Sequence, residues 1–167
     1  MDEAQRLVDL IPRLRRYARA LVGDRSGADD LVQDTLERAW SKLHLYRRGT
    51  DLRAWLFTVM HNVHVNKLRA VRPTDSLDED MLELAGRASQ ADALLVRDLD
   101  RAIGRLPADQ RAVLLLVTLE EMSYEDVART LGIPIGTVMS RLSRAREKLR
   151  AMMLGETPPA TKLKVVK

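Results

Sequence analysis

The chain has 167 residues, of which 31% are charged and 4% aromatic, and its formal net charge is +4. This length fits one ordinary domain or two small ones, and so modest a net charge does not by itself indicate nucleic-acid binding. The absence of cysteine excludes disulfides, thiolate zinc sites and thiol catalysis, and it favours a cytoplasmic protein. The longest apolar run, residues 112–117, is too short to span a membrane, and the N-terminus does not resemble a signal peptide, so no direct membrane insertion is expected.

Three amphipathic helices are predicted in residues 1–72. The first ends at a break over residues 23–27, the second follows at once, and the third runs from about 52 to 70 after a polar loop at 47–51. The second helix is expected to turn one apolar stripe inward, made of Leu31, Val32, Thr35, Leu36, Ala39, Trp40 and Leu43. Three helices of this length can bury a small core.

Two polar faces stand out on these helices. On the second helix, a band opposite the apolar stripe is formed by Asp30, Gln33, Asp34 and Glu37. Such a band suits docking to a basic coiled coil, although helices also commonly carry acidic side chains near the N-terminus, where the helix dipole favours them.

The third helix is predicted to project amides and cations together, on the side away from Leu56 and Val59. These residues are Asn62, Asn66, Lys67 and Arg69. Amides suit the edges of an unstacked base and cations suit its phosphates, while the alternative is a merely polar surface. His61 and His64 lie one turn apart, but no third ligand joins them, so no metal site is expected.

The second half of the chain is also predicted to be helical, which makes the fold all-α: two small helical bundles joined by a flexible acidic linker. The linker covers residues 73–90, the second bundle residues 91–154, and a mobile tail residues 155–167. In the second bundle a helix is expected to place Leu94, Leu95, Leu99, Ala102, Ile103 and Leu106 on one packed face.

Residues 123–150 are predicted to form a helix-turn-helix. Ser123 and Asp126 make a capping-box start for its first helix, Gly132 permits the end of that helix, and Pro134 can open the second. The spacing of apolar residues after Ile135 is helical.

The second helix of this motif has a basic outer face that begins with short polar side chains. The outward residues are predicted to be Thr137, Ser140, Arg141, Arg144 and Lys148. Short polar groups let a helix approach base edges, and arginine can bond guanine or clamp phosphate, so this helix suits the major groove of DNA. A solvated basic surface is the alternative, but over residues 141–150 only Glu147 offsets the cations.

Three blocks of the chain, in order, resemble bacterial RNA polymerase sigma factors of the small, two-domain extracytoplasmic-function (ECF) type, group IV of the sigma-70 family. ADDLVQDTLERAW (28–40) is similar to the segment that binds the polymerase core. LRAWLFTVMHNVHVNKLR (52–69) is similar to the segment that melts and reads the −10 promoter element, and residues 106–150 resemble the domain that reads the −35 element. The ordered trio is a more specific signal than a helix-turn-helix alone. The chain departs from the family pattern at Met139, where lysine is frequent, and at Glu121, where glycine is common.

The resemblance implies a sigma factor that binds core RNA polymerase and directs promoter-specific initiation, with no catalysis, cofactor, metal or small-molecule substrate. The band at residues 30–37 would contact the clamp helices of the largest polymerase subunit. The third helix would capture an unstacked −10 base, and the helix-turn-helix would read the −35 duplex. The linker would either thread the polymerase channel that later holds RNA or serve only as a tether. An anti-sigma factor is the implied regulator, covering the apolar faces of both bundles.

Two other functions stay open. A conventional helix-turn-helix regulator would use the first bundle for ligand binding or dimerisation, and a sigma-like decoy would bind an anti-sigma factor without reading promoters. An obligate dimer on palindromic DNA would favour the regulator, and a decayed recognition helix would favour the decoy. An enzyme is the remotest option, because the sequence has no phosphate-binding glycine loop, no nucleophile with a base and no metal cluster.

Overall fold

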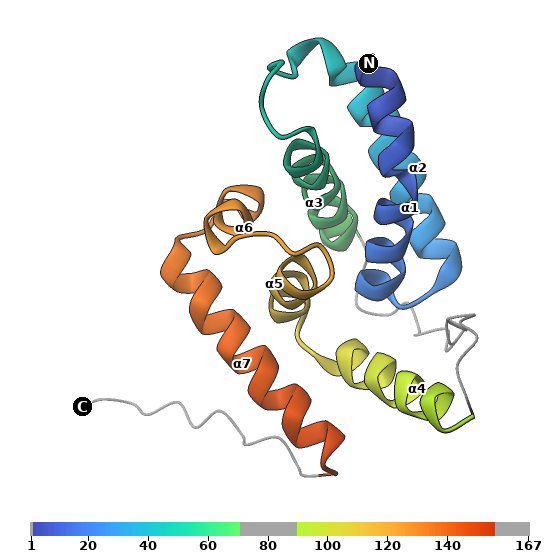
Figure 1. Cartoon of the computed structure of the whole chain (residues 1–167), viewed down its shortest axis with the longest axis vertical. Helices are drawn as coiled ribbons and strands as arrows, with labels where there is room; N and C mark the ends of the chain where they lie inside the picture. Colours follow the sequence, from blue (N-terminus) through green and yellow to red (C-terminus); the bar gives the residue numbers. More distant parts are fainter. Residues whose placement is uncertain (1, 71–89, 156–167) are drawn as a thin grey trace.

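The structure is a computed structural model that describes residues 2–70 and 90–155, and all regular structure in these ranges is helical. The N-terminal half holds α1 (Glu3–Val22), α2 (Arg25–Lys42), the short 3-10 helix η1 (Leu43–Leu45) and α3 (Leu52–Ala70). The C-terminal half holds α4 (Gln90–Arg105), α5 (Ala108–Thr118), α6 (Tyr124–Leu131) and α7 (Ile135–Met153). Figure 1 shows α6 beside α3, with α7 on the outer side of α5. The all-α prediction is confirmed, whereas most of the predicted linker and tail lie outside the described residues.

The break between the first two helices arises from local backbone chemistry. Gly23 ends α1 in the left-handed region, with φ at 85°, and its N–H donates to the carbonyl of Arg19 at 3.0 Å. Asp24 then begins α2, because its Oδ1 accepts a hydrogen bond of 2.9 Å from the Gly27 N–H. The two helices therefore form an antiparallel pair with a very short connection.

The core of the N-terminal half is built from the apolar stripes of α1, α2 and α3. Leu14, Leu31 and Leu56 are fully buried, and the rings of Tyr17 and Phe57 meet edge to face with centroids 5.1 Å apart. Helix α3 thus packs on both of the preceding helices.

Trp40 does not belong to this core, so its predicted inward position is wrong. It is 60% exposed, although its neighbour Ala39 is fully buried. At 3.6 residues per turn, Trp40 lies about 120° from the centre of the stripe that α2 buries. A helix with a narrow buried face leaves a residue at that angle in solvent.

In the C-terminal half, α5 is the central helix and α4 is only partly packed. Ala102 and Leu106 of α4 are buried, as predicted. The predicted packing of Leu94, Leu95 and Leu99 is wrong, since Leu94 is 60% exposed and the other two are also exposed. The first turns of α4 therefore keep large apolar side chains at the surface.

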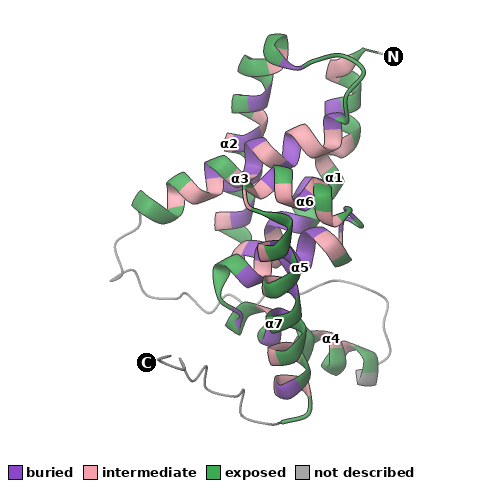
Figure 2. Cartoon of the chain, turned by 90° about the vertical axis from the view of Figure 1, so that its left-hand side faces the viewer, coloured by how far each residue is buried: buried purple, intermediate pink, exposed green. Residues whose placement is uncertain are grey.

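The two halves pack on each other, which no pattern in the sequence predicts. Their buried side chains belong to one continuous apolar cluster that includes Leu21 and Met60 from the first half and Leu115 and Val127 from the second. Figure 2 shows buried residues, in purple, gathered around α3, α5 and α6, and the contacts between the halves join α3 to α6 and α1 to α5. The sequence predicts two separate bundles, whereas in the structure a shared apolar interface joins them.

Candidate nucleic-acid and polymerase interface

The helix-turn-helix forms with the predicted caps. The Ser123 hydroxyl accepts a hydrogen bond from the Asp126 N–H at 3.1 Å, which satisfies a free donor at the start of α6. Gly132 ends α6 with φ at 65°, and Pro134 is the N-cap of α7. These local choices fix the angle at which α7 leaves the rest of the C-terminal half.

Helix α7 turns one face inward and exposes the opposite face. Val138, Leu142 and Ala145 are buried against α5 and α6. The side opposite them carries exposed residues, which are Gly136, Ser140, Ser143, Arg144, Glu147 and Arg150, with Met139 at its edge. This outer face is the part of α7 best placed to enter a groove.

The predicted DNA-contacting residues divide between the outer face and one flank of α7. Ser140 and Arg144 are exposed on the outer face. Thr137, Arg141 and Lys148 are half-buried on the flank, and the Arg141 Nε lies 3.5 Å from Oδ2 of Asp109 on α5. The guanidinium of Arg141 is thus partly engaged inside the protein.

Met139 and Ser143 were not among the predicted candidates for base contact, although both are exposed, Ser143 on the outer face and Met139 at its edge. The signal was present in the sequence: each lies far from the centre of the buried stripe of α7 when residues are placed 100° apart. A selection of polar and basic residues excludes Met139, whereas polar Ser143 is found only by its angle on the helix.

The backbone angle at Glu121 explains why glycine is common at this position in the family. It has a φ of 52°, in the left-handed region that glycine occupies most readily. The connection between α5 and α6 therefore needs an unusual backbone angle at this position.

On α2, the predicted acidic band lies opposite the buried stripe. Asp30, Gln33 and Glu37 are exposed, whereas Asp34 is half-buried and its Oδ2 lies 2.6 Å from the Nζ of Lys67 on α3. The exposed Trp40 is next to this band on the helix surface, so an aromatic ring accompanies the acidic side chains. Aromatic rings in such positions commonly contribute much of the binding energy at protein interfaces.

On α3, three of the four predicted strand-binding residues share a surface. Asn62, Asn66 and Arg69 line a crevice between α3 and α6. The predicted placement of Lys67 with them is wrong, because its position on the helix falls on the side of Leu56 and its ammonium group is drawn to Asp34 on α2. Asn66 also lines a groove between α2 and α3, where it lies with both members of the Asp34–Lys67 pair.

Two family models match the two halves of the chain. The sigma-70 region 4 model matches residues 96–149, and the model of the sigma2 domain of PhyR matches residues 7–61. The ECF RNA polymerase sigma factor EcfG of Rhodopseudomonas palustris is 38% identical over 145 residues, covering 86% of this chain and 80% of the relative. The chain belongs to the ECF RNA polymerase sigma factors. SigM of Mycobacterium tuberculosis, another ECF sigma factor, is 35% identical over 145 residues, covering 86% of this chain and 72% of the relative.

Solved structures share the fold of this ECF sigma factor. RpoE, crystallised with the anti-sigma factor NepR from Bartonella quintana, is 36% identical with a TM-score of 0.77, covering 93% of this chain and 99% of that chain. CnrH, solved with the cytosolic domain of CnrY, is 27% identical with a TM-score of 0.68, covering 92% and 88% of the two chains. The anti-anti-sigma factor PhyR, solved with NepR, is 15% identical with a TM-score of 0.61, covering 89% and 49% of the two chains, and shows the fold alone.

The two histidines of α3 in this ECF sigma factor are half-buried. Burial, and then the positive charge of Arg141, lowers the pKa of His61. Burial lowers the pKa of His64 to about 4, with further contributions from His61, Arg111 and Lys67. In the part of the chain that the structure describes, no group of three His, Cys, Asp or Glu side chains is placed to hold a metal ion. None of the helices within residues 2–70 and 90–155 is both long and apolar enough to cross a membrane.

Proposed function

We propose that this ECF sigma factor binds core RNA polymerase through α2, reads the −10 strand through α3 and reads the −35 duplex through α7. The observation that carries this proposal is that three separate helices present three different surfaces in the order of the family's blocks. The chain supplies recognition rather than chemistry, and its site of action is the cytoplasm, where it joins the polymerase.

The polymerase contact is assigned to the acidic band of α2, which consists of Asp30, Gln33, Asp34 and Glu37. Exposed Trp40 extends the same surface, and together they would dock on the clamp helices of the largest polymerase subunit. Acidic groups steer association with a basic partner, while an aromatic side chain supplies buried area once contact is made.

The −10 contact is assigned to α3, where Asn62, Asn66 and Arg69 line one crevice. Amides can pair with the edges of an unstacked base, and Arg69 can neutralise its phosphate. Lys67, engaged with Asp34, would join this contact only by exchanging its partner.

The −35 contact is assigned to α7. Ser140 and Arg144 are the most outward of the predicted residues, with Thr137, Arg141 and Lys148 along the flank. A bidentate arginine contributes about 1–3 kcal/mol of discrimination between bases. Two weak DNA contacts become useful together once both are tethered to the polymerase.

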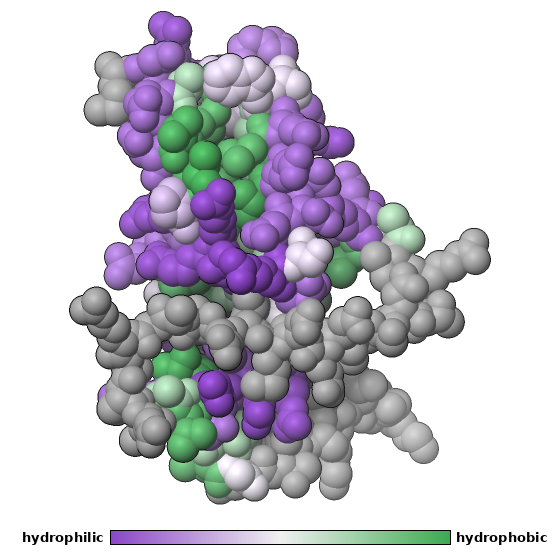
Figure 3. All heavy atoms as spheres, turned by 90° about the vertical axis from the view of Figure 1, so that its right-hand side faces the viewer, coloured by the Kyte–Doolittle hydropathy of each residue, from purple (hydrophilic) through white to green (hydrophobic). Residues whose placement is uncertain are grey.

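An anti-sigma factor is the proposed regulator. The first turns of α4 expose Leu94, Leu95 and Leu99. A separate apolar strip, in green, lies between hydrophilic side chains in the upper half of the face drawn in Figure 3. Exposed apolar surface of this kind is typical of protein interaction sites. The similar RpoE was crystallised with the anti-sigma factor NepR, which supports this assignment.

A sigma-like decoy is the second candidate, because the first half matches a model of the sigma2 domain of PhyR. The exposed Arg144 and Ser140 argue against it, since a decoy needs no intact recognition face.

Arg144→Ala distinguishes these two functions. In the proposed sigma factor it lowers transcription from a cognate promoter about fivefold or more and leaves binding to core polymerase unchanged. The matched control is Arg97→Ala, which removes the same charge from an exposed position on α4. Equal loss of transcription and core binding would indicate misfolding, and unchanged transcription with Arg144→Ala would remove the −35 assignment.

A further inference from the structure

Met139 is an exposed apolar side chain near the start of the helix proposed to read the −35 duplex. It is 50% exposed and lies in the second turn of α7, at the edge of the outer face. In a helix-turn-helix, the first residues of the second helix contact base edges, while the first helix crosses the sugar–phosphate backbone. Met139 therefore lies among the residues that are placed to reach the bases.

The neighbours of Met139 on the outer face are small. Gly136 lies one turn before it, Ser140 follows it directly and Ser143 lies one turn after it. A Cβ atom added at Gly136 would meet no heavy atom of the rest of the chain within 4 Å, so the space in front of this turn is open. The side chain of Met139 is longer than those of its three neighbours and can extend beyond them into a groove.

Two other large apolar residues of this region are exposed, but neither shares the position of Met139. Ile135 is 40% exposed and lies closer to the stripe that α7 buries, and Leu154 is 67% exposed and follows the last turn. Single exposed apolar residues are common on protein surfaces. Met139 differs from them in lying on the face that is proposed to enter the groove.

Arginines follow Met139 along the same side of α7. Arg146 and Arg150 are exposed and come about two and three turns after it. Arg146, Met139 and Tyr124 of α6 line one open hollow between the two helices. Because arginine binds phosphate well, this side of α7 suits the backbone of one DNA strand. Met139 would then face the margin of the major groove beside that strand.

One apolar group in the major groove suits the side chain of methionine. Base pairs present hydrogen-bond donors and acceptors there, and thymine adds a C5 methyl group, which lies at the margin of the groove near the backbone of its own strand. Methionine donates no hydrogen bond, but its flexible apolar chain packs well on irregular surfaces. Lysine, which is frequent at this position in the family, would instead favour phosphate or guanine.

We infer that Met139 contacts the C5 methyl group of one thymine in the −35 element and is a specificity-determining residue of this chain. This inference rests on the proposed reading of the −35 duplex by α7, and it adds the base that one side chain selects. Cytosine at that position lacks the methyl group and loses the contact. Loss of one methyl contact should lower promoter use about fourfold, which corresponds to about 0.8 kcal/mol.

The first test measures base preference in transcription by the holoenzyme. The template is a promoter located by run-off transcription on genomic DNA, with one helical turn of base pairs around −35 randomised and each template linked to a transcribed barcode. The wild type, Met139→Ala and Arg144→Ala are compared. The matched control is Leu154→Ala, which removes an exposed apolar side chain beyond the last turn of α7.

The wild type and Leu154→Ala should prefer thymine over cytosine about fourfold at one position, and Met139→Ala should lose that preference alone. Arg144→Ala should lose a preference at a different position. Unchanged preferences in Met139→Ala would overturn the inference, and a change in Arg144→Ala would then show that α7 still reads the −35 duplex. Absence of any preference in the wild type would overturn the inference together with the −35 assignment.

The second test changes the DNA and leaves the protein intact. Uracil in place of the selected thymine removes the C5 methyl group and keeps the O4 acceptor and the base pairing. The wild type should transcribe the uracil template about fourfold less than the thymine template, whereas Met139→Ala should transcribe both equally. Equal use of the two templates by the wild type would overturn the methyl contact.

Discussion

At the scale of single residues, Glu121 is a point of backbone strain. Its φ of 52° is the only positive value among the non-glycine residues that the structure describes. A side chain in this region costs about 1–2 kcal/mol, whereas glycine adopts it readily but loses more entropy on folding, by about 0.5–1 kcal/mol. Glu121→Gly should therefore raise the free energy of unfolding by about 0.5–1 kcal/mol, measured by urea denaturation.

The control for this change is Glu125→Gly, which removes a similar side chain from an ordinary helical position in the first turn of α6. That variant should lower the free energy of unfolding by about 0.5–1 kcal/mol. A loss of stability in both variants would contradict the strain at position 121.

His64 should make stability depend on pH. Its pKa is lowered to about 4 in the folded chain, largely by burial, while an unfolded histidine titrates near about 6.5. Between these values the unfolded state takes up the proton and the folded state does not, so the free energy of unfolding falls as the pH falls from about 6.5 to 4. Allowing for partial exposure of the ring, the contribution of His64 is about 1–2 kcal/mol.

His64→Gln removes this titration. Urea denaturation at about pH 7 and pH 5 should show a smaller loss of stability for the variant than for the wild type. Equal losses of stability in the wild type and in His64→Gln would mean that the pKa of His64 is not lowered in the folded chain.

At the scale of single helices, α2 links two assigned surfaces through Asp34. This residue belongs to the acidic band and also pairs with Lys67 on α3. A substitution at Asp34 could thus act through the polymerase contact or through the packing of α3. Glu37, exposed on the same band, lets the two effects be separated.

Asp34→Arg and Glu37→Arg should each weaken co-purification with core polymerase about tenfold or more, because a reversed charge meets a basic partner. Lys67→Ala breaks the pair with Asp34 and should keep the band functional, and Glu125→Arg on α6 controls for charge. If Lys67→Ala reproduces the loss caused by Asp34→Arg while Glu37→Arg has no effect, the acidic band is not the polymerase contact.

The helices themselves were largely predictable from sequence, for identifiable reasons. Gly23 and Gly132 both take the left-handed angle that ends a helix, and Ser123 makes its predicted cap. Errors occurred at the margins of the stripes. Trp40 was placed inward because apolar character was given more weight than angle, and Lys67 was placed outward because its partner lies on another helix.

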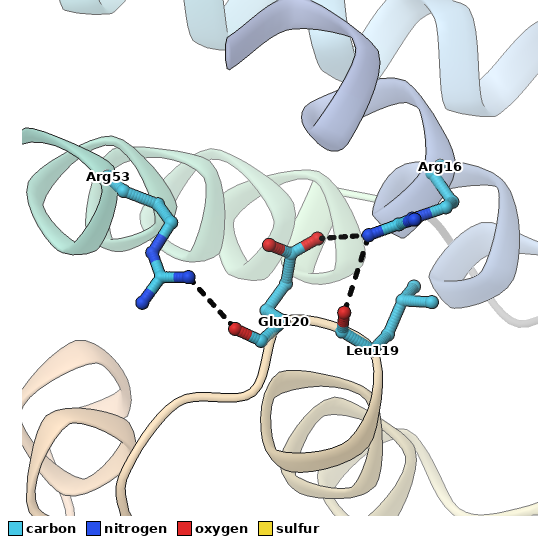
Figure 4. Close-up of polar contacts among 4 residues, drawn as sticks. All are labelled: Arg16, Arg53, Leu119 and Glu120. Carbon is cyan, nitrogen blue, oxygen red and sulfur yellow. Dashed lines mark hydrogen bonds and ion pairs between the residues drawn. The ribbon is translucent and has the colours of Figure 1, made fainter.

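At the scale of the whole molecule, the packing of the two halves was not predictable from the residues that create it. Arg111 and Arg53 bond to backbone carbonyls of the opposite half, and a carbonyl acceptor leaves no mark in a sequence. In the sequence, Glu120 resembles any acidic residue in a charged turn, although its side chain is fully buried in the structure, beside Arg16 (Figure 4). Caps, helix-ending glycines and apolar periodicity specify the helices. The interface depends instead on how the surfaces of the two folded halves fit together.

The whole molecule also determines how selective the chain is. Its separate surfaces carry few cations each, and phosphate neutralisation provides most non-specific affinity for DNA. Promoter selection is therefore expected only when α3 and α7 are both positioned on the polymerase.

The most direct test of promoter-directing function is run-off transcription on fragmented genomic DNA of the source bacterium, with purified core polymerase and the purified chain, followed by sequencing of transcript starts. We predict a limited set of start sites, absent with core polymerase alone, that share one upstream element near −10 and another near −35. Starts that are equally frequent with and without the chain, or that share no upstream elements, would contradict the assignment.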